Sequence, residues 1–380
     1  MTRPRRRSRW PRALSRAPSL SDEALQAHVR GYAGCPRILL RGWRDEDAEA
    51  CRLAIDAVRR AGERRLLSLH VSRYAHLRSY QADYRAACRT AEEGLRLALE
   101  VSNAYHYMTC QFHRAWALLH LGEWRELRSV LRDGLQMAER NGHRLYARGF
   151  RIQTAWLLTH VGNFASARAL CEQEPPTVEE VQIDRLLGGI VLGFAHLGLK
   201  RHAAALRAFQ GVTAQSTLLR SILQMPLRLG LGQYWLARKQ FGRAREQLQE
   251  LCRLAATSGE RTYLALGRQA LAEAALAQRD LPAAERELSE ALHAVDGNEV
   301  PLAEWRVCAT AARTELARGR RAKADAYWTR SAAVLDRLAA SLKDDADLHR
   351  SFLAQPAVQT VRRHGRSAAR PLAVARRAPR

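Results

Sequence analysis

A spacing of about 40 residues recurs seven times along this chain and limits its fold more than any other feature. Each recurrence begins just past a short polar turn, with a small or apolar residue three positions after its first residue. The spacing between successive starts is nearly constant. So regular a period predicts a stack of repeated units rather than one closed core. The seven pairs are Tyr84/Ala87, Trp124/Leu127, Phe164/Ala167, His202/Ala205, Phe241/Ala244, Leu281/Ala284 and Arg321/Ala324.

The composition indicates that the repeated units are helical. Ala, Leu and Arg dominate the chain, and all three favour helices, whereas only 12 Pro are present. We therefore expect an all-α fold, a right-handed α-solenoid of about seven antiparallel helix pairs with a period of about 40 residues. In such a stack each pair is expected to contact only its neighbours.

The repeats divide the chain into five expected segments. Seven repeats occupy 65–343, with N-terminal capping helices at 21–64 and C-terminal capping helices at 344–363. An end repeat needs one solvated side, which explains the caps. The two ends, 1–20 and 364–380, are rich in Arg and predict basic disordered tails.

Much of the formal net charge of +24 is concentrated at the two ends of the chain. Residues 1–20 and 361–380 each contain seven Arg and no acidic residue, which leaves +10 for everything between them. Two interpretations stay open: an Arg-rich composition without a ligand, or a surface for nucleic acid. Non-specific attraction of the tails to nucleic acid is expected with either one.

The cysteines and the hydropathy pattern bear on location. Seven Cys are scattered without a CxxC pair, which favours reduced thiols in a cytoplasmic protein. The longest apolar run, Leu186 to Leu199, is interrupted by His196 and is too short to cross a bilayer. No contact with a membrane is therefore expected.

The repeated units resemble the tetratricopeptide repeat. The fourth unit matches best, with Leu192 and Gly193 in its first helix, His202 at the turn, and Ala205 and Phe209 in its second helix. The resemblance covers about 65–340. Standard repeats of this family have about 34 residues, so the longer units of this chain imply longer helices.

The longer unit is similar to the sensor region of MalT-type transcription regulators, and to the repeat segments of bacterial regulators that carry ATPase or cyclase modules. In those families the repeats bind an inducer or a protein partner. This chain contains no GxxxxGK[ST] phosphate loop. The resemblance therefore implies an interaction scaffold or sensor for bacterial signalling or transcription regulation, with a protein segment, a peptide or a small signal ligand as its partner.

The sequence offers little for catalysis or metal binding. His106, His113 and His120 recur every seven residues, whereas chelation from one helix needs an i, i+4 spacing. A separation of seven residues is about 10 Å along a helix axis, which is too far for one ion. No GxSxG motif is present. We expect no catalytic, cofactor-binding or metal-binding residues, and rank an enzyme behind an interaction module and a nucleic-acid-binding repeat protein.

The family resemblance implies that certain positions of each first helix line a concave groove. These positions lie eight and four residues before the start of each second helix. They are aromatic or His-rich in units one to four and more polar or small in units five to seven. The candidate groove residues are His76, Tyr80, Trp116, His120, Trp156, His160, Phe194, Gln233, Glu273 and Arg313.

Two interpretations of this ladder stay open. Trp116 and Trp156 occupy equivalent positions in adjacent units, about 10 Å apart by helix packing distances. They either pack between the units or anchor an apolar ligand or a peptide, since aromatic residues dominate the energetics of such grooves. In the second case polar residues such as His120, His160 and Arg313 would set the register of the ligand.

Overall fold

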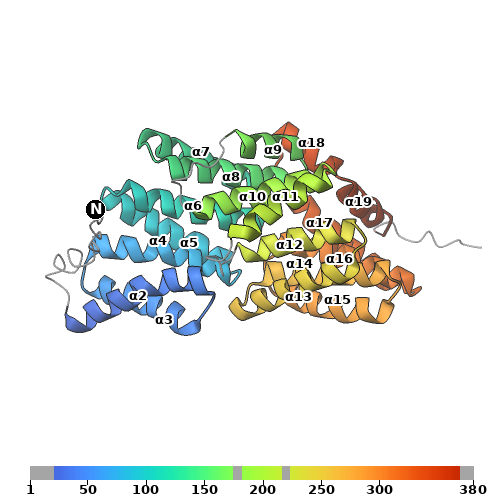
Figure 1. The fold of residues 1–380 in the computed structure, drawn as a ribbon, viewed down its shortest axis with the longest axis horizontal. Coiled ribbons are helices and arrows are strands. Elements are labelled where there is room, and N and C mark those ends of the chain that lie inside the picture. The colour runs from blue at the N-terminus through green and yellow to red at the C-terminus, as the bar shows by residue number, and fades with distance from the viewer. Residues whose placement is uncertain (1–20, 174–181, 216–222, 369–380) are drawn as a thin grey trace, which may run out of the picture.

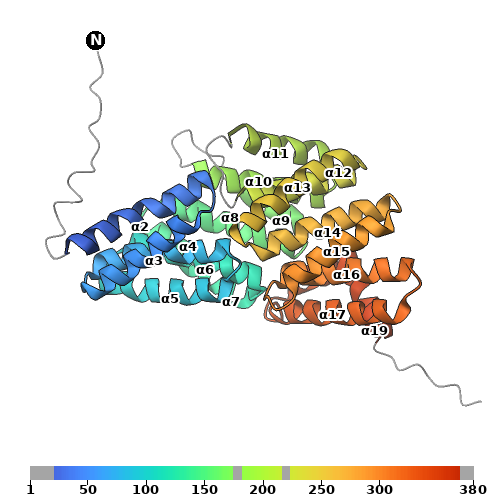
Figure 2. The same cartoon turned by 90° about the horizontal axis from the view of Figure 1, so that it is seen from below.

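The computed structural model describes residues 21–173, 182–215 and 223–368. These residues form helices joined by short turns, and the helix pairs lie side by side along the molecule (Figures 1 and 2). The predicted all-α solenoid of stacked helix pairs is confirmed. The predicted basic tail at 1–20 and most of the one at 364–380 lie outside the described residues.

The sequence period has a simple origin in the helices. In the first unit two helices of 17 residues alternate with the short links 81–83 and 101–103. The first helices of the seven units are α4 (Arg64–Tyr80), α6 (Ala104–Leu121), α8 (Arg144–His160), α10 (Gln182–Gly198), α12 (Gln224–Ala237), α14 (Arg261–Ala277) and α16 (Pro301–Ala317). The second helices are α5 (Tyr84–Glu100), α7 (Trp124–Arg140), α9 (Phe164–Glu172), α11 (His202–Gln215), α13 (Phe241–Ser258), α15 (Leu281–Val295) and α17 (Arg321–Ala340).

Two further helix pairs complete the described chain at its ends. The N-terminal pair is α2 (Asp22–Arg41) and α3 (Asp45–Arg60), and the C-terminal pair is α18 (Ala346–Ala354) and α19 (Pro356–Ala368). The side chain of Ser21 caps α2 by accepting a hydrogen bond from the Ala24 amide at 3.3 Å. Helix α19 includes 364–368, where the sequence predicts the start of the basic tail.

The repeated sequence signal marks the start of each second helix. Its first residue opens every second helix from α5 to α17, and the residue two positions earlier always has a positive φ. At Gly122 this conformation costs nothing, whereas Lys239 and Arg279 adopt it with a Cβ. The small or apolar residue three positions into the second helix is buried in every unit. This residue lets the two helices of a unit approach closely.

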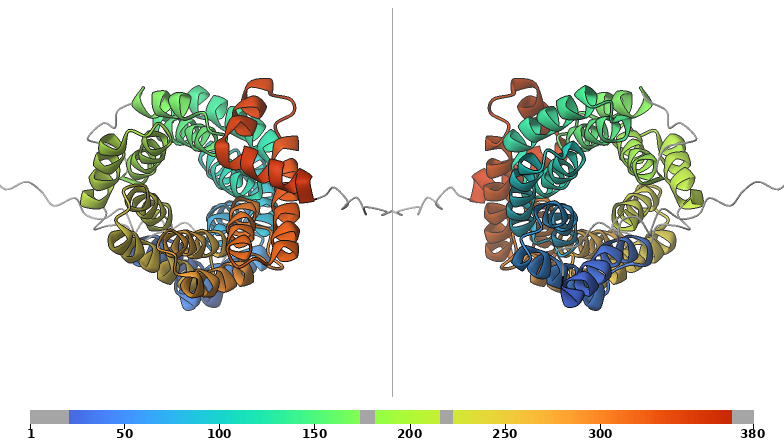
Figure 3. Two further views of the ribbon diagram at one scale, coloured as in Figure 1. Left: turned by 90° about the vertical axis from the view of Figure 1, so that its right-hand side faces the viewer. Right: turned by 90° about the vertical axis from the view of Figure 1, so that its left-hand side faces the viewer.

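The first helices form the inner layer of the molecule, and the second helices lie outside them (Figure 3). Each inner helix from α4 to α16 contacts the next inner helix as well as its own partner. An inner helix is therefore covered on several sides, which explains why α6, α8 and α14 bury so many residues.

The solenoid winds back on itself, so the expectation that each pair contacts only its neighbours is wrong. Units six and seven contact units one and two, and we call this contact the closure of the ring. The first and last helix pairs lie at opposite ends of the molecule (Figures 1 and 2). The helix pairs wind around one axis and form a ring in the view along the molecule (Figure 3). Inner helix α16 contacts α6, and the ring of Trp124 lies 5.3 Å from that of Phe352 on α18. Because the sequence period gives the length of a unit but not its rotation against the next, it cannot predict this closure.

Candidate functional site: an interior cavity

The inner helices surround a cavity of about 340 Å³. Its wall is built from α6, α8, α10, α12, α14 and α16, together with the first residues of α9 and α11 and with Gln355 between α18 and α19. A volume of this size lies at the small end of the range of ligand pockets. Because the wall draws on both halves of the chain, the cavity exists only when the ring is closed.

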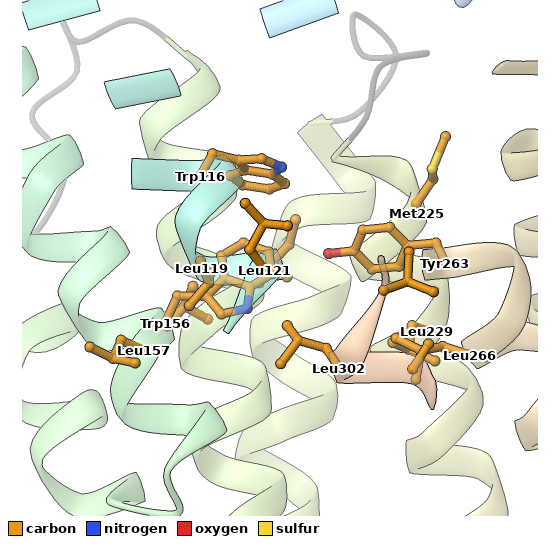
Figure 4. Close-up of a cluster of buried hydrophobic side chains, with 14 of the residues drawn as sticks. Trp116, Leu119, Leu121, Trp156, Leu157, Met225, Leu229, Tyr263, Leu266 and Leu302 are labelled. Carbon is orange, nitrogen blue, oxygen red and sulfur yellow. The ribbon is translucent and has the colours of Figure 1, made fainter. Parts of the chain in front are cut away.

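The two halves of the chain contribute different parts of their inner helices. Units two to five supply positions eight and four residues before the second helix, whereas units five to seven supply positions nearer the start of the first helix. Figure 4 shows the result: Trp116 and Trp156 belong to the same buried cluster as Tyr263, Leu266 and Leu302. Residues distant in sequence therefore meet in the interior.

The cavity brings together five of the ten candidate groove residues, and these five come from four adjacent inner helices. Trp156 and Phe194 supply aromatic surface, while His120, His160 and Gln233 supply polar groups. Apolar walls with a few polar groups are typical of small-molecule sites. These five residues were selected from the sequence by their position in the repeat alone.

The other five candidates lie outside the cavity wall. His76 packs against Tyr80 and His113, with ring centroids 5.2 and 4.3 Å away, in the interior of the first two units. Arg313 and Glu273 form an ion pair of 2.5 Å with each other. Trp116, the remaining candidate, also lies outside the cavity wall.

The two tryptophans are in direct contact, closer than the distance of about 10 Å that helix packing predicts for equivalent positions. Their ring centroids are 5.1 Å apart in an edge-to-face arrangement. The prediction follows from the distance between helix axes, whereas the large indole rings extend across that distance. Trp116 is 6% exposed and Trp156 is 4% exposed, and only Trp156 lines the cavity.

Two imidazoles in the cavity wall are neutral at physiological pH. Burial lowers the pKa of His120 to about 4. Burial, with the nearby charge of Arg306, lowers the pKa of His160 well below its ordinary value. The Nδ1 atom of His120 donates to the Trp116 carbonyl at 2.9 Å, so its Nε2 atom is a hydrogen-bond acceptor.

Arg306 is a residue of the cavity wall that the groove positions do not include. Among the described residues that line the cavity, it alone carries a permanent charge. A signal was present in the sequence, because the residues at the same distance before the second helix of the other six units are small or apolar. They are Leu69, Thr109, Gly149, Leu187, Pro226 and Leu266.

A buried polar contact joins the first and sixth units and helps to close the ring. The hydroxyl of Tyr84 donates to Glu260 Oε1 at 2.6 Å and lies 2.9 Å from Thr262 Oγ1, next to the cavity. Glu260 is fully buried, and burial raises its pKa to about 7. Its carboxylate also accepts hydrogen bonds from the amides of Thr262 and Tyr263 at the start of α14.

Contacts that are more exposed also join the early units of the chain to the late ones. Arg85 pairs with Glu299 through two nitrogens at 2.6 and 2.8 Å. Exposed ion pairs of this kind contribute little to stability. Gly122 lies so close to the Leu338 side chain that a Cβ atom would clash with it, which favours Gly there, as does its φ of 72°. The apolar and buried polar contacts therefore carry most of the closure.

We expect Tyr84→Phe to weaken the closure. The substitution leaves the carboxylate of Glu260 without its tyrosine donor and should lower the free energy of unfolding by about 1–3 kcal/mol. Urea denaturation of this variant and of the wild type measures the loss. Tyr105→Phe, at a tyrosine that is 50% exposed, serves as the control and should change little. Equal stability of all three proteins would contradict the role of the Tyr84 hydroxyl.

Within residues 21–173, 182–215 and 223–368, no group of three or more His, Cys, Asp or Glu residues is arranged to hold a metal ion. Across these three ranges, no helix has the length and apolar character needed to span a bilayer.

Comparisons with known proteins give matches among solved structures. No protein-family model and no curated protein matches the chain. Among solved structures, it is similar to a structure of the APC/C hetero-tetramer Cut9–Hcn1, with 12% identity, a TM-score of 0.35, and coverage of 91% of this chain and 74% of the other. It is also similar to a circular tandem repeat protein of novel repeat topology, with 15% identity, a TM-score of 0.24, and coverage of 91% and 95%. At these levels of similarity, neither structure bears on function.

Proposed function

We propose that this protein is a recognition module that binds a compact ligand in its interior cavity. The observation that carries the proposal is the cavity itself, walled by aromatic side chains with a few polar groups from six inner helices. This combination is typical of sites that bind small molecules or the end of a peptide. The interior position also agrees with the groove that the resemblance to tetratricopeptide repeats implies.

The closed ring favours a compact ligand over a long helix in an open groove. Tyr263 and Leu302 stand opposite the groove residues of the N-terminal half and occupy the space that a partner helix would need (Figure 4). The ring could respond to a ligand, because residues of the cavity wall such as Thr262 also belong to the closure. A ligand that contacts both halves would stabilise the closed form.

A regulatory role in bacterial signalling or transcription is part of this proposal. It is supported by the similarity of the long repeats to the sensor region of MalT-type regulators. All seven cysteines are unpaired thiols, which supports a reducing, cytoplasmic location. Nucleic-acid binding through the Arg-rich ends stays a prediction, since most of those residues lie outside the described part of the chain.

A variant that blocks the cavity tests the proposal. Ala237 is the last residue of α12, is exposed, and lines the cavity, so Ala237→Trp should fill the entrance without disturbing the fold. Ala277→Trp is a matched control, because Ala277 is the exposed last residue of α14 and lies outside the wall. The wild type and both variants are screened by thermal shift against a library of compact fragments and short peptides.

Bound fragments should raise the melting temperature of the wild type and of Ala277→Trp. With Ala237→Trp the shift should disappear, or the affinity should fall at least about tenfold. If every fragment that binds the wild type binds Ala237→Trp equally well, the cavity is not the recognition site.

A further inference from the structure

Arg306 makes the cavity suitable for an anion. Among the described residues, no carboxylate forms an ion pair with its guanidinium group. The carboxylate whose charge acts on Arg306 is that of Glu273, and it already forms an ion pair of 2.5 Å with Arg313. Burial lowers the pKa of Arg306 to about 10, so the group is charged at pH 7. Arg306 is half-buried. A cation that is partly removed from water without a counterion is costly, and a bound anion would lower that cost.

The structure also holds the guanidinium group in place. Arg306 Nη1 donates to the Leu302 carbonyl, and its Cζ atom lies 4.3 Å from the ring centroid of Trp305. Stacking on an aromatic ring leaves the in-plane N–H groups of an arginine available for a carboxylate. Arg306 is therefore prepared to accept a planar anion with little further loss of side-chain freedom.

The other residues of the cavity wall indicate which chemical groups the rest of the ligand carries. Trp156, Phe164, Phe194 and Tyr263 provide aromatic surfaces. Burial keeps His120 neutral by lowering its pKa, and because its Nδ1 atom donates to the Trp116 carbonyl, its Nε2 atom can accept a hydrogen bond. His160, Gln233 and Thr262 add polar groups to the wall, so the body of the ligand can carry a few hydrogen-bonding groups on an otherwise aromatic frame.

We propose that the interior cavity binds an organic carboxylate with a compact aromatic body, and that Arg306 is its counterion. The inference rests on the proposed function and adds the chemical class of the ligand. Such a carboxylate can belong to a free small molecule or to the C-terminal residue of a peptide. In both cases the carboxylate pairs with the guanidinium group while the aromatic body fills the space between the aromatic walls.

Matched acids and amides test this inference by calorimetric titration of the full chain. The first pair is 1-naphthylacetate and 1-naphthylacetamide, which represents a free small molecule. The second pair is N-acetylphenylalanine and its amide, which represents a peptide C-terminus. We expect the wild type to bind the acid of at least one pair about tenfold more tightly than the amide. Which pair shows the preference identifies the source of the carboxylate.

Two variants assign the preference to Arg306. Arg306→Met keeps an aliphatic stem on Trp305 and removes the charge, so it should bind acid and amide equally. Arg321→Met, at an exposed arginine that opens α17 outside the wall, is the control and should retain the preference. If Arg306→Met does not fold, Arg306→Lys replaces it and should bind the acid more weakly than the wild type while still preferring it to the amide.

The possible outcomes separate this inference from the proposed function. Equal affinity for acid and amide in the wild type, or a preference that survives in Arg306→Met, overturns the role of Arg306. Failure of all four probes to bind overturns the assignment of the ligand class. In each case, fragments whose binding depends on Ala237 would still support recognition in the cavity. Absence of any such fragment is the separate failure of the proposed function.

Discussion

Acidification from pH 7 to pH 4.5 is expected to lower the free energy of unfolding by roughly 5 kcal/mol. The cause is a set of histidines buried in the neutral state. Burial lowers the pKa of His70 to about 3, and the pKa of His76 and His120 to about 4. In the unfolded chain these groups protonate near pH 6.5, so below that pH the unfolded state binds more protons and stability falls.

Protonation of Glu260 has the opposite effect on the free energy of unfolding, but a smaller one. Its pKa in the folded protein is about 7, above the ordinary value of 4.5, so the folded state takes up this proton first as the pH falls. That uptake stabilises the fold by at most about 3 kcal/mol between pH 7 and pH 4.5. The three histidines together lose roughly 8 kcal/mol over the same range, since each loses about 1.4 kcal/mol per pH unit below pH 6.5. The net effect of acid is therefore destabilising.

Urea denaturation at a series of pH values measures this dependence. His120→Gln should reduce the slope of stability against pH by about one proton between pH 6.5 and pH 4.5. Gln278→Ala, at the exposed residue that follows α14, removes no titratable group and is the control that should leave the slope unchanged. Stability that is constant or rises toward pH 4.5 would show that the imidazoles are not held neutral by burial.

Replacement of either central tryptophan by Ala is expected to cost about 3–5 kcal/mol of stability. Trp116 and Trp156 are almost fully buried and contact each other, so each truncation leaves a large void in the interior. The double variant should lose less than the sum of the two single losses, because the second substitution removes a side chain whose partner is already absent. Thermal and urea denaturation measure all three values.

The same variants separate packing from recognition. Trp156 lines the cavity and Trp116 does not, so Trp156→Ala should also change ligand binding while Trp116→Ala should affect stability alone. Leu99→Ala, at a leucine that is 62% exposed on α5, controls for a truncation at the surface and should change stability by less than about 0.5 kcal/mol. If Trp156→Ala kept the stability of the wild type and lost binding, the packing role assigned to it would be wrong.

The pattern of small residues and turns predicted much of the local structure. Every second helix begins at the residue that opens the repeated signal, from Tyr84 to Arg321, and the residue three positions later is always buried. These features depend on contacts within one unit, so neighbouring residues in the sequence are enough to reveal them. For the same reason, the sequence predicted that His120, Trp156 and Phe194 occupy inner positions of their repeats.

The partners of those residues across the ring could not be predicted. Tyr84 meets Glu260, and Arg306 faces a cavity whose opposite wall is formed by distant units. Glu273 and Arg313 were placed in the groove by their position in the repeat, yet they pair with each other outside the cavity wall. Such contacts depend on the accumulated rotation of many units, and the sequence of one unit does not encode that rotation.

By itself, the amino-acid sequence determined that this chain forms stacked helix pairs, how long the repeated unit is, and where the second helix of each unit begins. Helical periodicity and the need for small residues where helices cross are local constraints. They therefore produce a residue pattern that recurs in every unit of the sequence. Only the tertiary structure decided that the later units fold back onto the earlier ones, and that Arg306, which pairs with no carboxylate among the described residues, lies in the wall of an aromatic cavity. A small rotation per unit, summed over seven units, brings the two halves together.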